Sequence, residues 1–252
     1  MQPAWCAAVL AILIPIVSQA AQDPRLAKQQ WIDARLKHRK VTSDIHLDLG
    51  MLRYDRIDQV TDNWSSWSRL ELNFVSTDLP ARDNRTGQWH TGMGDTLMHY
   101  ALITSPTPGF RYGAGLQVTI PTNTRDSLGY GRYTWAPAVM AEVDLPVSRG
   151  SYAQLIVRNM RDAGGDDHRT KFRQTIIQPT VQIRLPQHFF VEAVADGRVN
   201  YETDKKWFVS TGIGIGRFLS RQAMVSLTWS KGVKDDMPNY DTELEARVMY
   251  WF

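Results

Sequence analysis

Apolar and polar residues alternate with a period of two along most of this chain. Between Phe110 and Ile120 every second residue is aromatic or aliphatic, and the residues between them are Arg, Gly, Gln or Thr. The segment from Tyr133 to Asp144 largely repeats the rule. Such alternation is typical of a β-strand with one apolar and one polar face. Strands of about 9–11 residues with aromatic residues near their ends suit a tilted crossing of a lipid bilayer.

The same pattern recurs without helical segments between its copies. Gly92–Pro146 reads as three strands, and the other candidates are 44–52, 67–75, 151–160, 172–185, 188–198, 206–218, 223–230 and 242–252. From residue 67 onward, short connections alternate with longer ones, as periplasmic turns and extracellular loops do in bacterial barrels. Because such barrels have even strand counts, a further strand is expected within 28–41 or 55–66. The sequence predicts an all-β fold, a transmembrane antiparallel up-and-down β-barrel of twelve strands, with ten as the alternative.

The N-terminal forty residues differ from the rest. Residues 1–20 hold no charged side chain, an apolar run from Ala7 to Val17, and Ser18 and Ala20 at the positions of a cleavage site. They predict a signal peptide that removes Cys6, the single cysteine. Residues 21–40 are polar and basic and are interpreted as a periplasmic segment, with a plug helix or an extra strand as alternatives. The barrel is assigned to residues 41–252.

Two irregularities interrupt the alternation. Pro137 and Pro179 fall inside predicted strands, where each would remove a ladder hydrogen bond, so bulges or shortened strands are expected there. Trp67 shares the apolar face of its strand only if the phase slips near Ser68.

An ordered set of small residues and prolines lies within Gly92–Pro146. Its members are Gly92, Gly94, Asp95, Gly113, Gly115, Pro121, Gly129, Gly131 and Pro137. This order resembles the bacterial outer-membrane barrels of the "MetA-pathway of phenol degradation" transporter family. The resemblance implies an outer-membrane barrel that passes small hydrophobic or aromatic compounds. Asp95 is interpreted as a turn-capping residue, with substrate contact as the alternative.

The last strand ends on Phe252 after alternating apolar residues. A C-terminal Phe in this setting resembles the signal read by the barrel assembly machinery of Gram-negative bacteria. Together with the signal peptide, it predicts export to the cell outer membrane, with membrane lipid and the assembly machinery as partners.

If the apolar faces contact lipid, the polar faces line a lumen. The candidate lining residues are Arg69, Glu71, Arg111, Gln117, Glu142, Arg158, Gln178, Gln182, Arg184, Glu192, Asp196, Glu243, Glu245 and Arg247, together with Asp44, His46 and Asp48. These charges have two interpretations: pairs that hold a small barrel closed, or a lining that guides small-molecule cargo.

Composition and motifs exclude several other functions. The formal net charge of +3 is spread along the chain without a basic stripe, which argues against nucleic acid as a partner. No cofactor, metal or catalytic residue is expected. An adhesive or structural barrel is the alternative function, and a barrel lipid hydrolase using His90 or His99 is a weaker one. We therefore expect a non-enzymatic channel or transporter.

Overall fold

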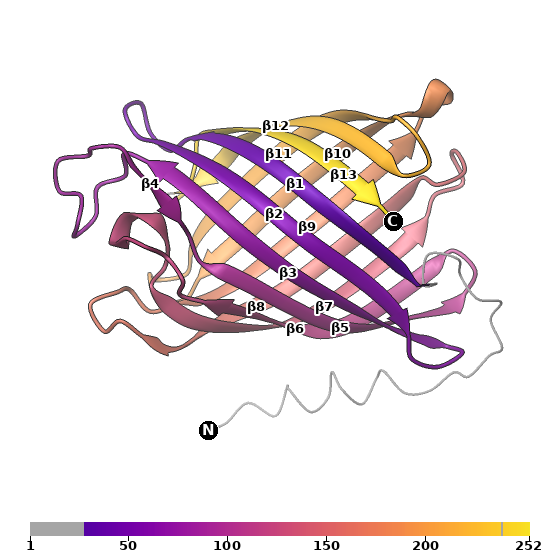
Figure 1. Ribbon diagram of the computed structural model, residues 1–252, viewed down its shortest axis with the longest axis horizontal. Coiled ribbons are helices and arrows are strands. Elements are labelled where there is room, and N and C mark those ends of the chain that lie inside the picture. The colour runs from indigo at the N-terminus through magenta and orange to yellow at the C-terminus, as the bar shows by residue number, and fades with distance from the viewer. Residues whose placement is uncertain (1–27, 238) are drawn as a thin grey trace.

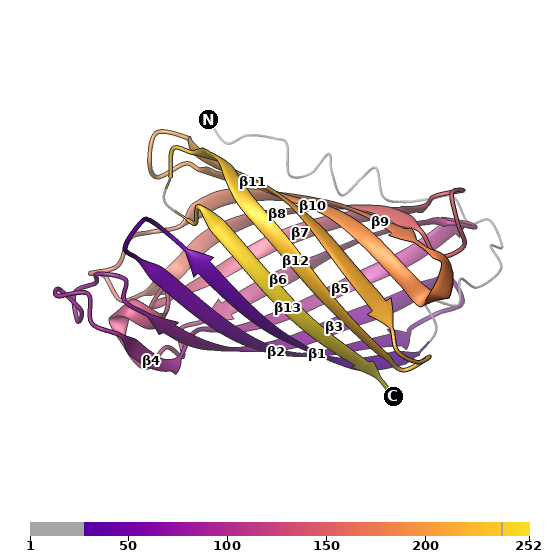
Figure 2. The same ribbon diagram turned by 90° about the horizontal axis from the view of Figure 1, so that it is seen from above.

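The computed structural model describes residues 28–237 and 239–252, which form a closed antiparallel β-barrel (Figures 1 and 2). Successive strands pair in chain order, and β1 pairs with β13 to close the sheet. β4 and β5 both pair with β3 and follow each other along it, so together they count as one strand of the wall. The barrel is therefore twelve-stranded. The strands are β1 Gln29–Lys40, β2 His46–Gln59, β3 Trp64–Thr77, β4 His90–Met93, β5 Thr96–Thr107, β6 Phe110–Ile120, β7 Arg132–Asp144, β8 Tyr152–Gly165, β9 Arg173–Arg184, β10 Phe189–Asn200, β11 Lys206–Phe218, β12 Ala223–Asp235 and β13 Thr242–Trp251.

The period-two alternation separates the two faces of the wall. Large apolar side chains such as Leu36, Ile213 and Val248 are exposed on the outer face, where a membrane barrel meets lipid. Charged side chains such as Asp33 and Glu71 are buried on the inner face. Within the described part of the chain, no helix is long and apolar enough to cross a membrane.

The two ends of the barrel differ in their connections. The longest loops, 78–89 and 121–131, lie at one end, which we call the long-loop end; the second contains the short helix η2, Asp126–Leu128. The start of β1, the end of β13 and short links such as 108–109 and 219–222 lie at the other, the short-turn end. In bacterial barrels the short turns face the periplasm.

The structure corrects the expected N-terminal boundary. Residues 29–40, assigned to a periplasmic segment, form β1, the further strand expected within 28–41. Its inner face carries Asp33, Arg35, Lys37 and Arg39, and this density of charge makes the sequence resemble a solvent-exposed tail. The predicted signal peptide and residues 21–27 lie outside the described residues.

The phase of two strands also differs from expectation. In β2, Met51 is buried on the inner face, whereas Asp48, expected in the lumen, is exposed beside His38 on the outer face, with its carboxylate 2.6 Å from the His38 ring nitrogen. In β3 the pairing with β2 runs without a register shift, so Trp67 faces inward like Arg69. An indole N–H that finds a carboxylate partner explains why Trp67 is stable there.

Neither internal proline forms the expected bulge. Pro137 pairs in register with Leu116, and Pro179 pairs in register with Leu155. The ladder to the other neighbouring strand is instead interrupted locally, between the pairs Trp135–Arg161 and Ala138–Arg158 in the case of Pro137. The missing proline N–H thus costs hydrogen bonds to one neighbouring strand, and no extra residue is inserted as in a bulge.

Candidate functional site: the charged lumen

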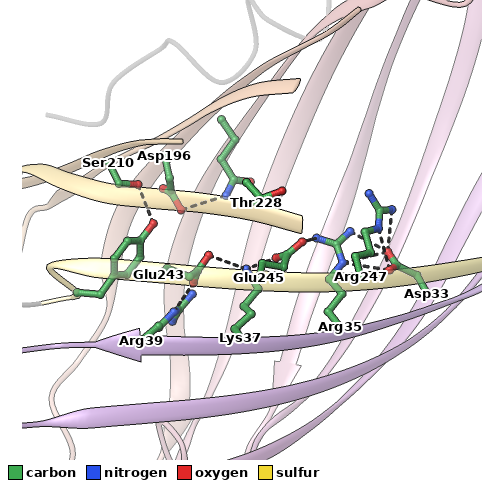
Figure 3. A network of polar contacts seen from close by, with 12 residues as sticks. Asp33, Arg35, Lys37, Arg39, Asp196, Ser210, Thr228, Glu243, Glu245 and Arg247 are labelled. Atoms are coloured by element: carbon green, nitrogen blue, oxygen red, sulfur yellow. Dashed lines mark hydrogen bonds and ion pairs between the residues drawn. The ribbon is translucent and has the colours of Figure 1, made fainter. Parts of the chain in front are cut away.

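A continuous chain of ion pairs follows the inner face where the first and last strands meet (Figure 3). Side chains two residues apart on a strand share a face, so each strand contributes a row. We call these residues the seam belt: Asp33, Arg35, Lys37 and Arg39 from β1, and Glu243, Glu245 and Arg247 from β13.

Asp33 is the hub of the seam belt. Its carboxylate accepts two hydrogen bonds of 2.9 Å from Arg247 and one of 2.7 Å from Arg35. Arg35 also reaches Glu245 at 3.2 Å, and Lys37 joins Glu245 at 2.5 Å to Glu243 at 3.1 Å. Bidentate guanidinium–carboxylate pairs of this kind are geometrically specific. The belt therefore fixes the inner side chains on both strands of the closure.

The chain of pairs continues onto β2 and β3. Arg53 binds Glu71 at 2.5 Å, and Arg69 binds Asp55 at 2.8 Å. The Asp55 carboxylate also accepts the Trp67 indole N–H at 2.7 Å. The Trp67 ring packs against His99 of β5, with ring centroids 4.7 Å apart. One band of charge therefore covers the inner wall from β13 to β3.

Within this band the basic groups are more exposed to the lumen than their acidic partners. The side chains of Arg35 and Arg69 retain 16% exposure, whereas Asp33 and Asp55 have none. Arg39 retains 17% against 8% for Glu243. The acids lie against the wall behind the guanidinium groups. The band consequently presents positive charge to the lumen.

A second group lies on the opposite part of the wall, on β8 to β10. Arg198 binds Asp196 at 2.7 Å, and Gln178 donates to Asp196 at 3.2 Å. Arg158 donates to the Gln178 side-chain oxygen and, among the described residues, forms no ion pair. Arg158 therefore adds to the lumen a positive charge that has no direct ion-pair partner in the described chain.

Glycines on the inner face of β11 allow its neighbours to meet. The Thr228 hydroxyl of β12 donates to Glu192 of β10 at 2.7 Å, across the backbone of Gly214. A Cβ at Gly214 would lie 2.6 Å from Thr228 and 2.7 Å from Glu192. The ring of Phe190 covers Gly216 in the same way.

An apolar cluster occupies the inner face at the short-turn end. Phe190, Met224 and Met249 are buried there, with Trp31, Phe218 and Trp251 packed around them. The Arg184 guanidinium lies 3.6 Å from the Phe218 ring centroid, a cation–π contact. On the neighbouring wall, Arg111 binds Glu142 at 2.6 Å and Asp144 at 2.8 Å. The lumen thus offers aromatic faces next to positive charge.

Two long loops fold together at the long-loop end. The Asp83 carboxylate accepts the backbone N–H groups of Asp126 and Ser127, at 2.9 and 3.0 Å. Asp95, between β4 and β5, accepts the Tyr130 N–H at 2.6 Å. Burial raises the pKa of the Asp95 carboxyl, and the backbone N–H donors around it act in the opposite direction. These contacts hold loop 121–131 against β4.

The resemblance motif divides into two structural groups. At the long-loop end, a Cβ at Gly129 would lie 2.7 Å from Asp95, and Gly131 adopts a left-handed φ of 67°. Pro121 begins the loop that these residues close. In the wall, Gly113 and Gly115 allow close approach to the backbone of β5, and Pro137 lies on the strand that pairs with β6. Asp95 thus binds the backbone of a distant loop, whereas the sequence had favoured a cap on its own turn.

Of the predicted lining residues, Asp44 lies in the turn before β2, and His46 and Asp48 lie beside His38 on the outer face. The other predicted lining residues lie on the inner face, in separate groups. Arg69, Glu71, Glu243, Glu245 and Arg247 lie in the band from β13 to β3; Arg158, Gln178, Glu192 and Asp196 lie on the opposite part of the wall; and Arg111, Glu142, Gln182 and Arg184 lie nearer the short-turn end, with Gln117 beside His99. Their action on a solute stays a prediction. Sequence reasoning missed Asp33, Arg35, Lys37, Arg39, Arg53 and Asp55. Their spacing of two was the signal that could have found them.

Of the two histidines named for a hydrolase, His99 packs against the Trp67 ring, and His90 lies near a serine and an acid. The His90 Nδ1 atom lies 2.9 Å from the Ser127 hydroxyl and 3.9 Å from Asp83. A Ser–His–acid triad needs the serine and the acid on opposite ring nitrogens, whereas both here approach the same one. Among residues 28–237 and 239–252, no group of three His, Asp or Glu side chains is arranged to hold a metal ion.

Known proteins place this barrel in a family. Residues 37–250 match the family model described as "Putative MetA-pathway of phenol degradation". The barrel is similar to the COG4313 outer membrane channel from Pseudomonas putida F1, with a TM-score of 0.75 and 15% identity over 95% of this chain and 100% of that one. It also resembles the NanC porin, with a TM-score of 0.60 and 11% identity over 87% and 98% of the chains.

The KdgM porin is a further structural neighbour, with a TM-score of 0.55 and 9% identity over 88% of this chain and 99% of that chain. No curated protein matches the chain. The chain therefore belongs to the family described as "Putative MetA-pathway of phenol degradation", and it shares the fold of outer-membrane barrels.

Proposed function

We propose that this protein is a passive outer-membrane channel for small molecules and that it favours anionic solutes over cationic ones. The observation that carries the proposal is the arrangement of the band from β13 to β3. Its guanidinium groups face the lumen, and its acids lie behind them. Basic groups that line a narrow passage lower the energy of an anion in it and raise that of a cation.

The ion pairs that line the barrel leave its axis unbridged. Arg35 pairs with residues of β1 and β13, Arg53 with β1 and β3, and Arg198 within β10. Each pair thus joins the same strand or a neighbouring one. Within the described chain, charge compensation follows the wall without a direct ion pair across the lumen, so the two sequence interpretations of the charges are compatible.

The apolar cluster at the short-turn end is an argument for aromatic solutes as cargo. A solute with a carboxylate or phenolate can contact the arginines of the band while its ring packs on Phe218 or Trp251. Small aromatic anions satisfy both surfaces, and no energy source is needed for such a passage.

Planar-bilayer recording of the folded protein tests this function. Folding is first verified by heat-modifiable gel migration, and current is then measured in a KCl gradient. Discrete current steps are expected, with a reversal potential shifted toward the equilibrium potential of chloride. An added aromatic carboxylate such as benzoate should block the current. A folded barrel that conducts no current, or one selective for potassium, would contradict the proposal.

A further inference from the structure

Two arginines face each other on the outer wall near the long-loop end. Arg161 of β8 and Arg173 of β9 are direct partners in the antiparallel register. Both are exposed, and both lie on the outer face, because the alternating positions Met160 and Gln174 are buried on the inner face. Directly opposed residues on antiparallel strands have Cβ atoms about 5 Å apart.

No acid compensates this pair of charges. Among the described residues, neither guanidinium forms an ion pair, and Arg161 donates only to the Asn159 side chain, at 2.8 Å. Like charges directly opposite each other on a sheet are destabilising. The arginines of the lumen band, by contrast, each have a carboxylate partner.

Each guanidinium rests on an aromatic ring that orients it. The Arg161 Cζ atom lies 5.7 Å from the Trp135 ring centroid, and the Arg173 Cζ atom lies 5.5 Å from that of Tyr201. Stacking on a ring leaves the edge of a guanidinium, with its N–H donors, free for an anion. Trp135 pairs with Arg161 from β7, and Tyr201 lies beside Arg173 at the end of β10, so the two rings flank the arginine pair. The N–H donors are therefore spread side by side along the outer wall, where the phosphates of one headgroup can reach them.

The height of the pair on the barrel identifies the source of that phosphate. Tyr133, Trp135 and Tyr201 are exposed outer-face aromatics at this end. Aromatic girdles mark the level of the lipid headgroups, which carry the phosphates of a membrane. A guanidinium at this level meets headgroups before any free solute.

We propose that Arg161 and Arg173, held by Trp135 and Tyr201, form a binding site for the phosphorylated headgroup of an outer-leaflet lipid. Phosphates of the headgroup replace the repulsion between the two guanidinium groups with charge-assisted hydrogen bonds. The site lies on the lipid side of the wall and is independent of the lumen.

Native mass spectrometry of the folded protein with bis-phosphorylated lipid A tests the site. The variant carries Arg161→Gln and Arg173→Gln. The matched control is Arg217→Gln, because Arg217 is an exposed outer-face arginine with its Cζ atom 5.0 Å from the Phe189 ring centroid, but at the short-turn end. Heat-modifiable migration verifies that all three proteins are folded.

The wild type is expected to bind the phosphorylated lipid at least about tenfold more tightly than the double variant, since each lost charged hydrogen bond is worth about tenfold or more. The Arg217→Gln control should bind like the wild type, and dephosphorylated lipid should bind the wild type as weakly as the double variant. Equal binding by wild type and double variant, or an equal loss in the control, overturns the site. Inorganic phosphate that binds as tightly as the lipid would refute the assignment to a headgroup.

Discussion

At the scale of single residues, a few buried acids in the lumen each form ion pairs with more than one base. Asp33 is fully buried and binds Arg35 and Arg247, with Arg53 at 4.0 Å. A buried ion pair contributes little by itself, but removal of one partner leaves an uncompensated charge. Asp33 therefore matters more for stability than an exposed acid of the same type.

Asp33→Asn should lower the free energy of unfolding in lipid vesicles by about 3–5 kcal/mol, because it removes the buried counter-ion that two partly buried arginines share. Asp48→Asn is the matched control. Among the described residues, Asp48 pairs with the exposed His38 alone, so a change of about 0–1 kcal/mol is expected. Urea titrations followed by tryptophan fluorescence measure both. Similar losses in the two variants would show that the seam belt does not depend on Asp33.

At the scale of elements, the strands differ in how well the sequence pattern predicts them. The strands from Phe110 to Phe252 could be predicted because their outer faces are apolar and their inner faces polar. β1 was obscured because its row of charges resembles a soluble tail. The phase of β2 was misread because Met51, an apolar residue, faces inward. Periodicity alone cannot assign a face when both faces hold apolar residues.

The lumen lining was only partly predictable for a related reason. Alternation identified residues such as Arg69 and Glu245 as facing inward, but it could not show which acid pairs with which base. That information depends on the register between strands far apart in sequence, as in the pairing of Arg35 with Glu245. The role of the β11 glycines likewise required the positions of Phe190 and Glu192.

Gly216→Ala should lower the free energy of unfolding by about 1–3 kcal/mol, since the added methyl group would overlap the Phe190 ring in a packed cluster. Gly197→Ala is the control, because the nearest atom to its added Cβ is a carbonyl oxygen of Ile177 at 3.8 Å. Denaturant midpoints in vesicles compare the two. A neutral Gly216→Ala would mean that Phe190 moves aside without cost.

Asp95→Asn should loosen loop 121–131, because the charge that accepts the Tyr130 N–H is lost. Limited trypsin digestion measures this, since Arg125 is exposed within the loop. Cleavage after Arg125 should accelerate on the order of tenfold, as expected for the loss of about 1.5 kcal/mol from a charged hydrogen bond. Asp44→Asn, in an exposed turn, serves as the control. Unchanged cleavage in Asp95→Asn would remove Asp95 from the loop contact.

At the scale of the whole molecule, the field of the lumen is the sum of its groups. The band from β13 to β3 presents its bases, and Arg158 adds a positive charge from the opposite wall. Selectivity is therefore distributed, and single changes should shift it in proportion to the charge removed.

Arg158→Gln should reduce the ratio of chloride to potassium permeability with little change in stability, because no acid in the described chain forms an ion pair with Arg158. Reversal potentials in a KCl gradient measure the ratio. Arg217→Gln, on the outer wall, should leave it unchanged. An unaltered ratio in Arg158→Gln would place Arg158 outside the conduction path.

The seam belt also has a kinetic consequence. β1 and β13 are the two free edges of any unclosed sheet made from this chain, and such edges invite pairing with other molecules. The inner row of β1 has three bases and one acid, and that of β13 has two acids and one base. The edges therefore attract each other over a distance before their first hydrogen bond forms. Closure of the cylinder should be fastest at low ionic strength, where this attraction is least screened.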